Sequence, residues 1–383
     1  MSHQPRQSLD STMLWLALAL IAIGLVAISS ASVSHAEHLY GNPWRQTLRH
    51  MMYLMIGFIA ATAAFFTPMS LWRKASPWLL LLAIGLLVAV LIPGVGRMVN
   101  GSQRWLPLGP INFQPSEFAK LAMVVWLSGF LVRHGDQVRE SWQGLAKPIA
   151  VLLFLALLLL AEPDFGATVI LLGTAFGLLF MAGARLVYVI GLVAIALGSM
   201  VAMVYAAPYR MQRLMAYQDP WADPFGSGFQ LIQSLIAYGR GEWFGVGLGN
   251  SIQKLFYLPE AHTDFVFSIW AEETGLVGAV AVIAIFAALV ARIMWVGYQA
   301  LGQNRLFEGY LCFGFALIFA GQAFVNMGVS SGLLPTKGLT LPFISYGGSS
   351  LIVSCMMLGM LLRLERDREP ANQRRARRKR VEA

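Results

Sequence analysis

The chain has 383 residues, of which 57% are hydrophobic and only 12% are charged, and its formal net charge is +9. A soluble domain carries roughly 25% charged residues, so this composition excludes an ordinary soluble protein and indicates an integral membrane protein. The two cysteines, Cys312 and Cys355, both fall inside apolar runs, which favours buried or lipid-facing thiols over a disulfide.

Ten apolar runs approach or reach the length of about 20 residues that a helix needs to cross a bilayer. They lie at 13–34, 50–67, 76–93, 116–132, 148–161, 166–182, 186–207, 265–291, 307–328 and 344–362. The pattern predicts an all-α polytopic membrane protein with about ten transmembrane helices. We expect a short N-terminus over 1–12, a single ten-span domain over 13–362 and a basic tail over 363–383.

Positive charge sets the expected orientation, because Lys and Arg concentrate on the cytoplasmic side of membrane proteins. The tail beyond Leu362 is rich in Arg, which assigns both termini to the cytoplasm. Two long segments, 94–115 and 208–264, are then extracytoplasmic loops, and their content of Trp, Gly and Pro predicts that they are ordered. Both loops carry cations, which suit the phosphate or diphosphate of a lipid ligand.

The second loop ends in the stretch Tyr257–Phe265, which places the acid Asp264 at the mouth of an apolar run. Charge is costly near lipid, so an acid held there is first considered as a functional group. Asp264 could take a proton from a sugar hydroxyl as a general base. Alternatively, Thr263 or Asp264 could cap the helix expected near Phe265, an effect of about 1 kcal/mol.

Two further polar residues lie beside Asp264 in the same stretch. His262 could orient the acid or contact a substrate, and Glu260 could be a second carboxylate or an ion-pair partner for Arg240 or Lys254. For His262 and Glu260 an ordinary role as polar surface is equally open.

The first loop and the span after it hold three more candidates. Trp105, which follows Arg104, could stack on a sugar or anchor the loop among head groups. Lys120 falls a few residues into an expected span, where a charge must be paired or reach outward. Glu117, three residues earlier, is the local alternative partner for Lys120.

Lys337 lies in the segment 334–342, whose two prolines exclude a continuous helix. Irregular backbone at membrane depth occurs where it is buried or lines a cavity, so we interpret Lys337 as a diphosphate ligand.

Glu272 and Glu273 are expected two turns beyond Asp264 in one helix, about 12 Å deeper by the helical rise. They could relay protons, line a cavity or hold helices together. The Gly-rich segment 245–249 follows no strand, so we interpret it as flexible backbone beside a substrate cleft and not as a nucleotide loop.

Six motifs then point to a known family. They are Asn100–Leu106, Phe113–Lys120, Glu162–Gly166, Leu258–Phe265, Pro335–Gly338 and Ser345–Ser349. In this order they resemble the SEDS proteins (shape, elongation, division, sporulation) over nearly the whole chain. The stretch Ser251–Lys254 and the basic tail look more like the division branch of that family than its elongation branch.

The resemblance implies a peptidoglycan glycosyltransferase that polymerises lipid II at the outer face of the cytoplasmic (inner) membrane, during septal cell-wall synthesis. It implies undecaprenyl diphosphate-linked glycan as a substrate, and a class B penicillin-binding protein and other divisome membrane proteins as partners. It assigns catalysis to Asp264. The expected substrate-binding residues are Trp105, Arg104, Lys120, Lys337, Glu260, His262, Arg240 and Lys254.

Three points stay open beside that reading. A lipid II flippase, which would depend on Glu272 and Glu273, and a non-catalytic division scaffold are the alternatives. No Cys/His cluster has zinc spacing, and although a divalent cation on the diphosphate is compatible, no dedicated ligand set is visible. The basic tail fits an orientation signal or anionic lipid, so no nucleic-acid partner is expected.

Overall fold

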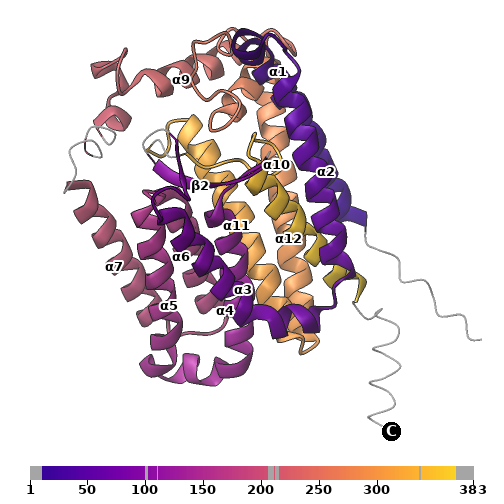
Figure 1. Ribbon diagram of the computed structural model, residues 1–383, viewed down its shortest axis with the longest axis vertical. Coiled ribbons are helices and arrows are strands. Elements are labelled where there is room, and N and C mark those ends of the chain that lie inside the picture. The colour runs from indigo at the N-terminus through magenta and orange to yellow at the C-terminus, as the bar shows by residue number, and fades with distance from the viewer. Residues whose placement is uncertain are drawn as a thin grey trace, which may run out of the picture.

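The computed structural model describes residues 11–99, 102–109, 111–205, 211, 215–335 and 338–367. It is built almost wholly from helices, which confirms the all-α prediction (Figure 1). The long helices are α1 (Ser11–Tyr40), α2 (Arg45–Phe66), α3 (Met69–Leu91), α4 (Pro115–Glu140), α5 (Trp142–Ala161), α6 (Phe165–Met181), α7 (Leu186–Tyr205), α10 (Val266–Gly302), α11 (Leu306–Ser330) and α12 (Gly348–Arg366). A shorter helix, α9 (Phe229–Gly241), and a 3-10 turn, η1 (Pro220–Ala222), lie between α7 and α10.

Eight of the described helices are long and apolar enough to cross a membrane, namely α1 to α5 and α10 to α12. Two shorter apolar helices, α6 and the first part of α7, complete the set. All of these helices fall on the apolar runs expected from the sequence, and the number of actual crossings stays a prediction.

The loop between α3 and α4 contains a small antiparallel sheet of strands β1 (Arg97–Val99), β2 (Ser102–Leu108) and β3 (Ile111–Phe113), in that order. The composition of this loop predicts that it is ordered, but it does not predict a sheet. β3 leads directly into α4 through Gln114, whose backbone N–H donates to Ser349 Oγ at the start of α12 (2.8 Å). The sheet is thereby fixed to the helix bundle.

Helix α10 is broken at Gly275, where the backbone has φ +70° and ψ −169°. The segment after α9 fills this break. Val246 N–H donates to Glu272 O (3.0 Å) and Gly247 N–H to Glu273 O (3.1 Å), while Leu276 N–H donates to Glu242 O (2.8 Å). These bonds satisfy backbone groups that the interrupted helix would otherwise leave without partners.

This arrangement corrects one expectation and bears on a second. The Gly-rich segment 245–249 is not free backbone beside a cleft, because a Cβ on Gly245 would collide with the backbone of Glu273. Glu272 and Glu273 lie in α10 about two turns after Asp264, as expected, and before the break at Gly275. Their carboxylates contact the segment 240–254, and their depth in the membrane stays a prediction.

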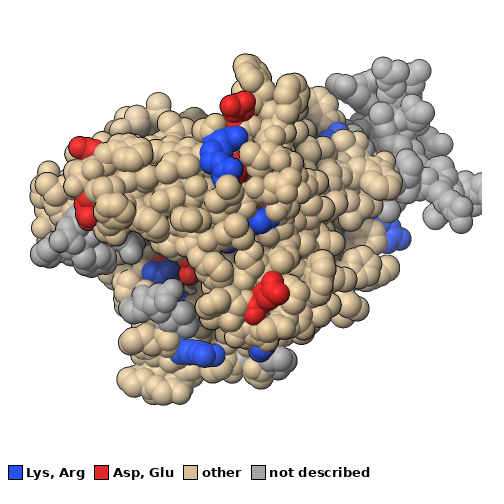
Figure 2. Space-filling model, turned by 90° about the horizontal axis from the view of Figure 1, so that it is seen from above, with Lys and Arg blue, Asp and Glu red and all other residues tan. Residues whose placement is uncertain are grey.

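The sheet and α9 lie toward one end of the bundle (Figure 1), and α10, which begins just after Asp264, contacts α9. We call this end the Asp264 end. Figure 2 shows this end from above. Most of its surface is uncharged, and acidic and basic side chains are seen together inside a hollow.

Candidate active site

Asp264 lies just before α10 and keeps part of its surface exposed. Its backbone carbonyl accepts a hydrogen bond from Asn326 Nδ2 of α11 (3.0 Å), which fixes its position. Its carboxylate forms no hydrogen bond or ion pair with any residue that the structure describes. A Cβ built on Gly338 would lie 3.0 Å from Asp264 Oδ2, so the backbone at residue 338 passes close to the acid.

The capping alternative for Asp264 and Thr263 is wrong. The N-cap residue of α10 is Phe265, and no side chain caps the helix. Thr263 Oγ1 instead donates to Glu260 Oε2 (2.6 Å). The Asp264 carboxylate is therefore available for chemistry.

The surroundings of Asp264 set its proton affinity. Burial and, to a smaller extent, the negative charge of Glu260 raise the pKa of the Asp264 carboxyl, the positive charge of Arg104 opposes both, and the net value is about 7. A carboxylate with a pKa near the working pH is well suited to act as a general base.

Arg104, in strand β2, is held by the turn between α5 and α6. Its Nε donates to Glu162 O (3.1 Å), one terminal nitrogen donates to Pro163 O, and the other lies 4.0 Å from Asp164 Oδ1. We call these three contacts of the Arg104 guanidinium the clamp. The sequence suggested Arg104 as a substrate ligand but gave no sign of the clamp. The clamp fixes a guanidinium where it acts electrostatically on Asp264.

Asp164 organises the base of the clamp. It caps α6 by accepting from Ala167 N–H (3.2 Å), and its other oxygen accepts from Ser116 Oγ (3.0 Å) and Gln114 Nε2 (3.2 Å). Asp164 thus joins the start of α4, the start of α6 and strand β2.

Glu162, next to the clamp, is fully buried, and neither carboxylate oxygen has a partner among the described residues. Burial and the charge of Asp164 raise the pKa of Glu162 and the charge of Arg104 opposes them, with a net value of about 9. Glu162 therefore keeps its proton at neutral pH.

His262 packs in a group of aromatic side chains. Its ring lies 5.2 Å from His35 and 5.7 Å from Tyr346, measured between centroids, and its Nε2 is 3.3 Å from Gln46 Nε2. Burial lowers the pKa of His262 to about 4, so the ring is neutral at pH 7. His262 therefore supports the loop that carries Asp264, whereas Glu260 lies at the surface.

Lys120 is almost completely buried, and its Nζ forms an ion pair with Glu117 Oε1 (2.9 Å). The local pairing that the sequence offered as the alternative is therefore present. Trp105 is partly exposed in β2, opposite Arg97 and next to Arg104. Lys337 lies outside the described residues, so its expected role stays a prediction.

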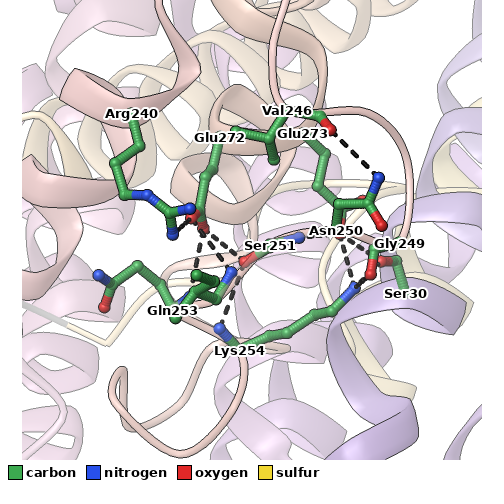
Figure 3. Close-up of polar contacts among 11 residues, drawn as sticks. Ser30, Arg240, Val246, Gly249, Asn250, Ser251, Gln253, Lys254, Glu272 and Glu273 are labelled. Carbon is green, nitrogen blue, oxygen red and sulfur yellow. Dashed lines mark hydrogen bonds and ion pairs between the residues drawn. The ribbon is translucent and has the colours of Figure 1, made fainter.

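Arg240 and Lys254 take part in a buried ion-pair cluster (Figure 3). Arg240 Nη1 contacts Glu272 Oε1 (2.7 Å), and Lys254 Nζ contacts Glu273 Oε1 (2.8 Å). Lys254 also donates to Ser30 Oγ (2.8 Å) of α1 and to Gly249 O (2.7 Å). The proposed pairing of either cation with Glu260 is wrong, because both cations contact other carboxylates. Their expected contact with substrate stays a prediction.

No three His, Cys, Asp or Glu side chains within the described ranges gather in a way that could hold a metal ion.

Comparisons with known proteins agree with the motifs. A family model described as "Cell cycle protein", covering FtsW, RodA and SpoVE, matches residues 11–370. The probable peptidoglycan glycosyltransferase FtsW of Pseudomonas fluorescens (strain SBW25) is 51% identical over 358 residues, which is 93% of this chain and 88% of that protein. The protein of the same name from Hahella chejuensis (strain KCTC 2396) is 52% identical, over 93% of this chain and 90% of its own.

Solved structures give the same result. A chain from a study of how a peptidoglycan synthase complex coordinates polymerization and crosslinking matches with a TM-score of 0.76 and 34% identity, over 94% of this chain and 98% of that chain. The rod shape determining protein RodA of Thermus thermophilus matches with a TM-score of 0.70 and 30% identity, over 95% and 98%. The chain therefore belongs to the FtsW, RodA and SpoVE family, the SEDS family that its motifs predict.

Proposed function

We propose that this chain is a peptidoglycan glycosyltransferase of the FtsW type that polymerises lipid II, with Asp264 as its general base. The observation that carries the assignment is the carboxylate of Asp264, which has no hydrogen-bond or ion-pair partner among the described residues and whose pKa is raised to about 7. Neighbouring acids are engaged elsewhere: Asp164 caps a helix, and Glu272 and Glu273 are paired with cations.

In the proposed reaction the growing glycan is the donor and is attached to undecaprenyl diphosphate through its anomeric carbon. A hydroxyl oxygen of an incoming lipid II attacks that carbon, and its proton passes to the Asp264 carboxylate. The bond from the anomeric carbon to the diphosphate oxygen breaks, so the product forms with inversion and undecaprenyl diphosphate leaves. The negative charge that develops on the leaving group requires nearby cations.

Among the described residues, Arg104 is the cation that acts electrostatically on Asp264. Its clamp at the α5–α6 turn holds it in place before substrate binds. A preorganised charge needs little rearrangement during the reaction and so stabilises the transition state effectively. Trp105, the next residue in β2, offers a flat face for a sugar ring. Lys337 is proposed as a second diphosphate ligand on the strength of the family motif.

The decisive experiment uses the purified full chain with its class B penicillin-binding partner, supplied with lipid II and assayed for glycan strands. We expect Asp264→Asn to lower the polymerisation rate by about 10²–10⁴-fold, the range for loss of a general base. Asp219→Asn is the matched control, because Asp219 is an exposed acid before η1 in the same interhelical segment. Full activity of folded Asp264→Asn would refute the base assignment.

The location is part of the same proposal. We place the Asp264 end outside the cytoplasm and both termini in the cytoplasm. We also place the protein at the division septum, next to its class B partner. Arg363 and Arg366 at the end of α12 support this orientation through the positive-inside rule. Because Cys312 and Cys355 are both buried, a cysteine introduced at Ser227 would report this orientation: an impermeant thiol reagent should label it in whole cells after outer-layer permeabilisation.

A flippase would depend on Glu272 and Glu273 and not on Asp264. The ion pairs of both glutamates argue against a mobile proton-carrying role. Polymerisation by the detergent-purified complex, which has no transmembrane gradient, separates the two functions.

A further inference from the structure

A cavity of about 470 Å³ lies at the end of the bundle opposite Asp264. It is formed by the start of α3, the last third of α4 and the start of α11. Phe307 of α11 lines it, whereas Asn326 of the same helix contacts Asp264. The helical rise over those residues is roughly 28 Å, close to the thickness of a bilayer core. The cavity and the candidate active site are therefore distinct and face opposite membrane surfaces.

Three cations line the cavity: Arg73 and Lys74 of α3 and Arg133 of α4. All three are exposed, and none of their side chains forms an ion pair or hydrogen bond with a described residue. The carboxylate in the lining, Glu308, lies 3.5 Å from Arg305. Three like charges around one cavity repel one another, so an anion bound between them would be stabilised by all three.

The depth of the cavity indicates where that anion comes from. Trp78, one helical turn beyond Lys74, is 72% exposed, and exposed Trp residues of membrane helices mark the head-group level. Met69 and Phe307 are buried and give the cavity an apolar wall. Cations for a phosphate beside an apolar wall match the head group and first carbons of a phospholipid.

We propose that this cavity binds the phosphate head group of an anionic membrane lipid, in the leaflet opposite the Asp264 end. Arg73, Lys74 and Arg133 contact the phosphate, and Met69 and Phe307 contact the glycerol and the first acyl carbons. A soluble phosphate compound would use the cations but gain nothing from the apolar wall, so the two sources can be separated.

The test uses the purified full chain in a neutral detergent, titrated with dioctanoyl phosphatidylglycerol. The cavity variant carries Arg73→Gln and Arg133→Gln. The control variant carries Lys147→Gln and Arg185→Gln, which removes two exposed cations from the same end of the bundle but outside the cavity. Dioctanoyl phosphatidylcholine and glycerol 3-phosphate are the comparison ligands, and polymerisation of lipid II checks that each variant is folded.

We expect the cavity variant to bind phosphatidylglycerol about 10–30-fold more weakly than the unmodified chain, since each of the two removed cations contributes about three- to fivefold in affinity near a head group. The control variant should keep its affinity to within about twofold. Equal affinities in the two variants would overturn the proposal. Glycerol 3-phosphate binding as tightly as phosphatidylglycerol would assign the cavity to a soluble anion and would also overturn it.

Discussion

The α-carbon of Gly338 faces the carboxylate of Asp264, and a Cβ built on residue 338 would lie 3.0 Å from Asp264 Oδ2. That separation is tighter than an ordinary carbon–oxygen contact, so even one added methyl group must displace the acid or its supporting backbone. The close approach explains why a residue without a side chain suits position 338.

Gly338→Ala should therefore lower kcat for lipid II polymerisation by about tenfold, because small displacements of a reacting group have large effects on rate. The half-saturation concentration should change much less. Gly239→Ala in α9 is the control, since a Cβ there meets open space. An unchanged kcat in Gly338→Ala would show that Asp264 has room to adjust or does not react.

The pH dependence of the reaction tests the electrostatic surroundings of Asp264. A base with a pKa of about 7 is about one-tenth ionised at pH 6, so the rate there should be about a tenth of its plateau at high pH. Arg104→Gln removes a charge that lowers the pKa of Asp264, so the acidic limb of the profile should move to higher pH. Glu260→Gln removes a charge that raises this pKa, so the same limb should move to lower pH.

These two shifts are measured as kcat/KM against pH for the purified complex. Their opposite signs are the useful feature, because a general loss of folding would not produce them. Shifts in the same direction would contradict the assignment of the acidic limb to Asp264.

Glu162 should make the stability of the folded chain depend on pH. Its pKa is about 9 in the folded chain against an ordinary value of 4.5, so between these values the folded state holds a proton that the unfolded state has lost. The free energy of unfolding therefore falls as the pH rises through this window. Glu162→Gln cannot ionise and lacks this contribution.

The expected result is an apparent Tm that drops further between pH 6 and pH 9 in the unmodified chain than in Glu162→Gln. Glu37→Gln, at an exposed position, should follow the unmodified chain. Parallel curves for all three proteins would mean that Glu162 is ionised or solvated in the folded state.

Much of the helical architecture follows from hydropathy, because a span needs only a long apolar run, and each such run contains a described helix. The break in α10 could not be anticipated in the same way. A single glycine in an apolar helical run is usually tolerated. Gly275 breaks the helix because the segment after α9 supplies hydrogen bonds to the interrupted backbone, which only the folded structure reveals.

The candidate site divides along similar lines. Asp264 stood out from the sequence because an acid beside a membrane span demands an explanation. The partners of the cations could not be identified from the sequence, since Arg240 and Glu272 are 32 positions apart and Arg104 and Glu162 are 58 apart. Such pairings depend on how α9, β2 and the α5–α6 turn pack, and local spacing says nothing about them.

The ion pair between Lys254 and Glu273 gives the sharpest test of a structural role against a substrate-binding one. Lys254→Met leaves the Glu273 carboxylate buried without its cation, which should destabilise the chain by about 3–5 kcal/mol. Adding Glu273→Gln removes the uncompensated charge and should recover most of the lost stability. Ser30 can still form a hydrogen bond to the amide. If Lys254 is structural, the double variant should have an unchanged half-saturation concentration for lipid II. A double variant that regains its stability but needs more lipid II would return Lys254 to the substrate-binding residues.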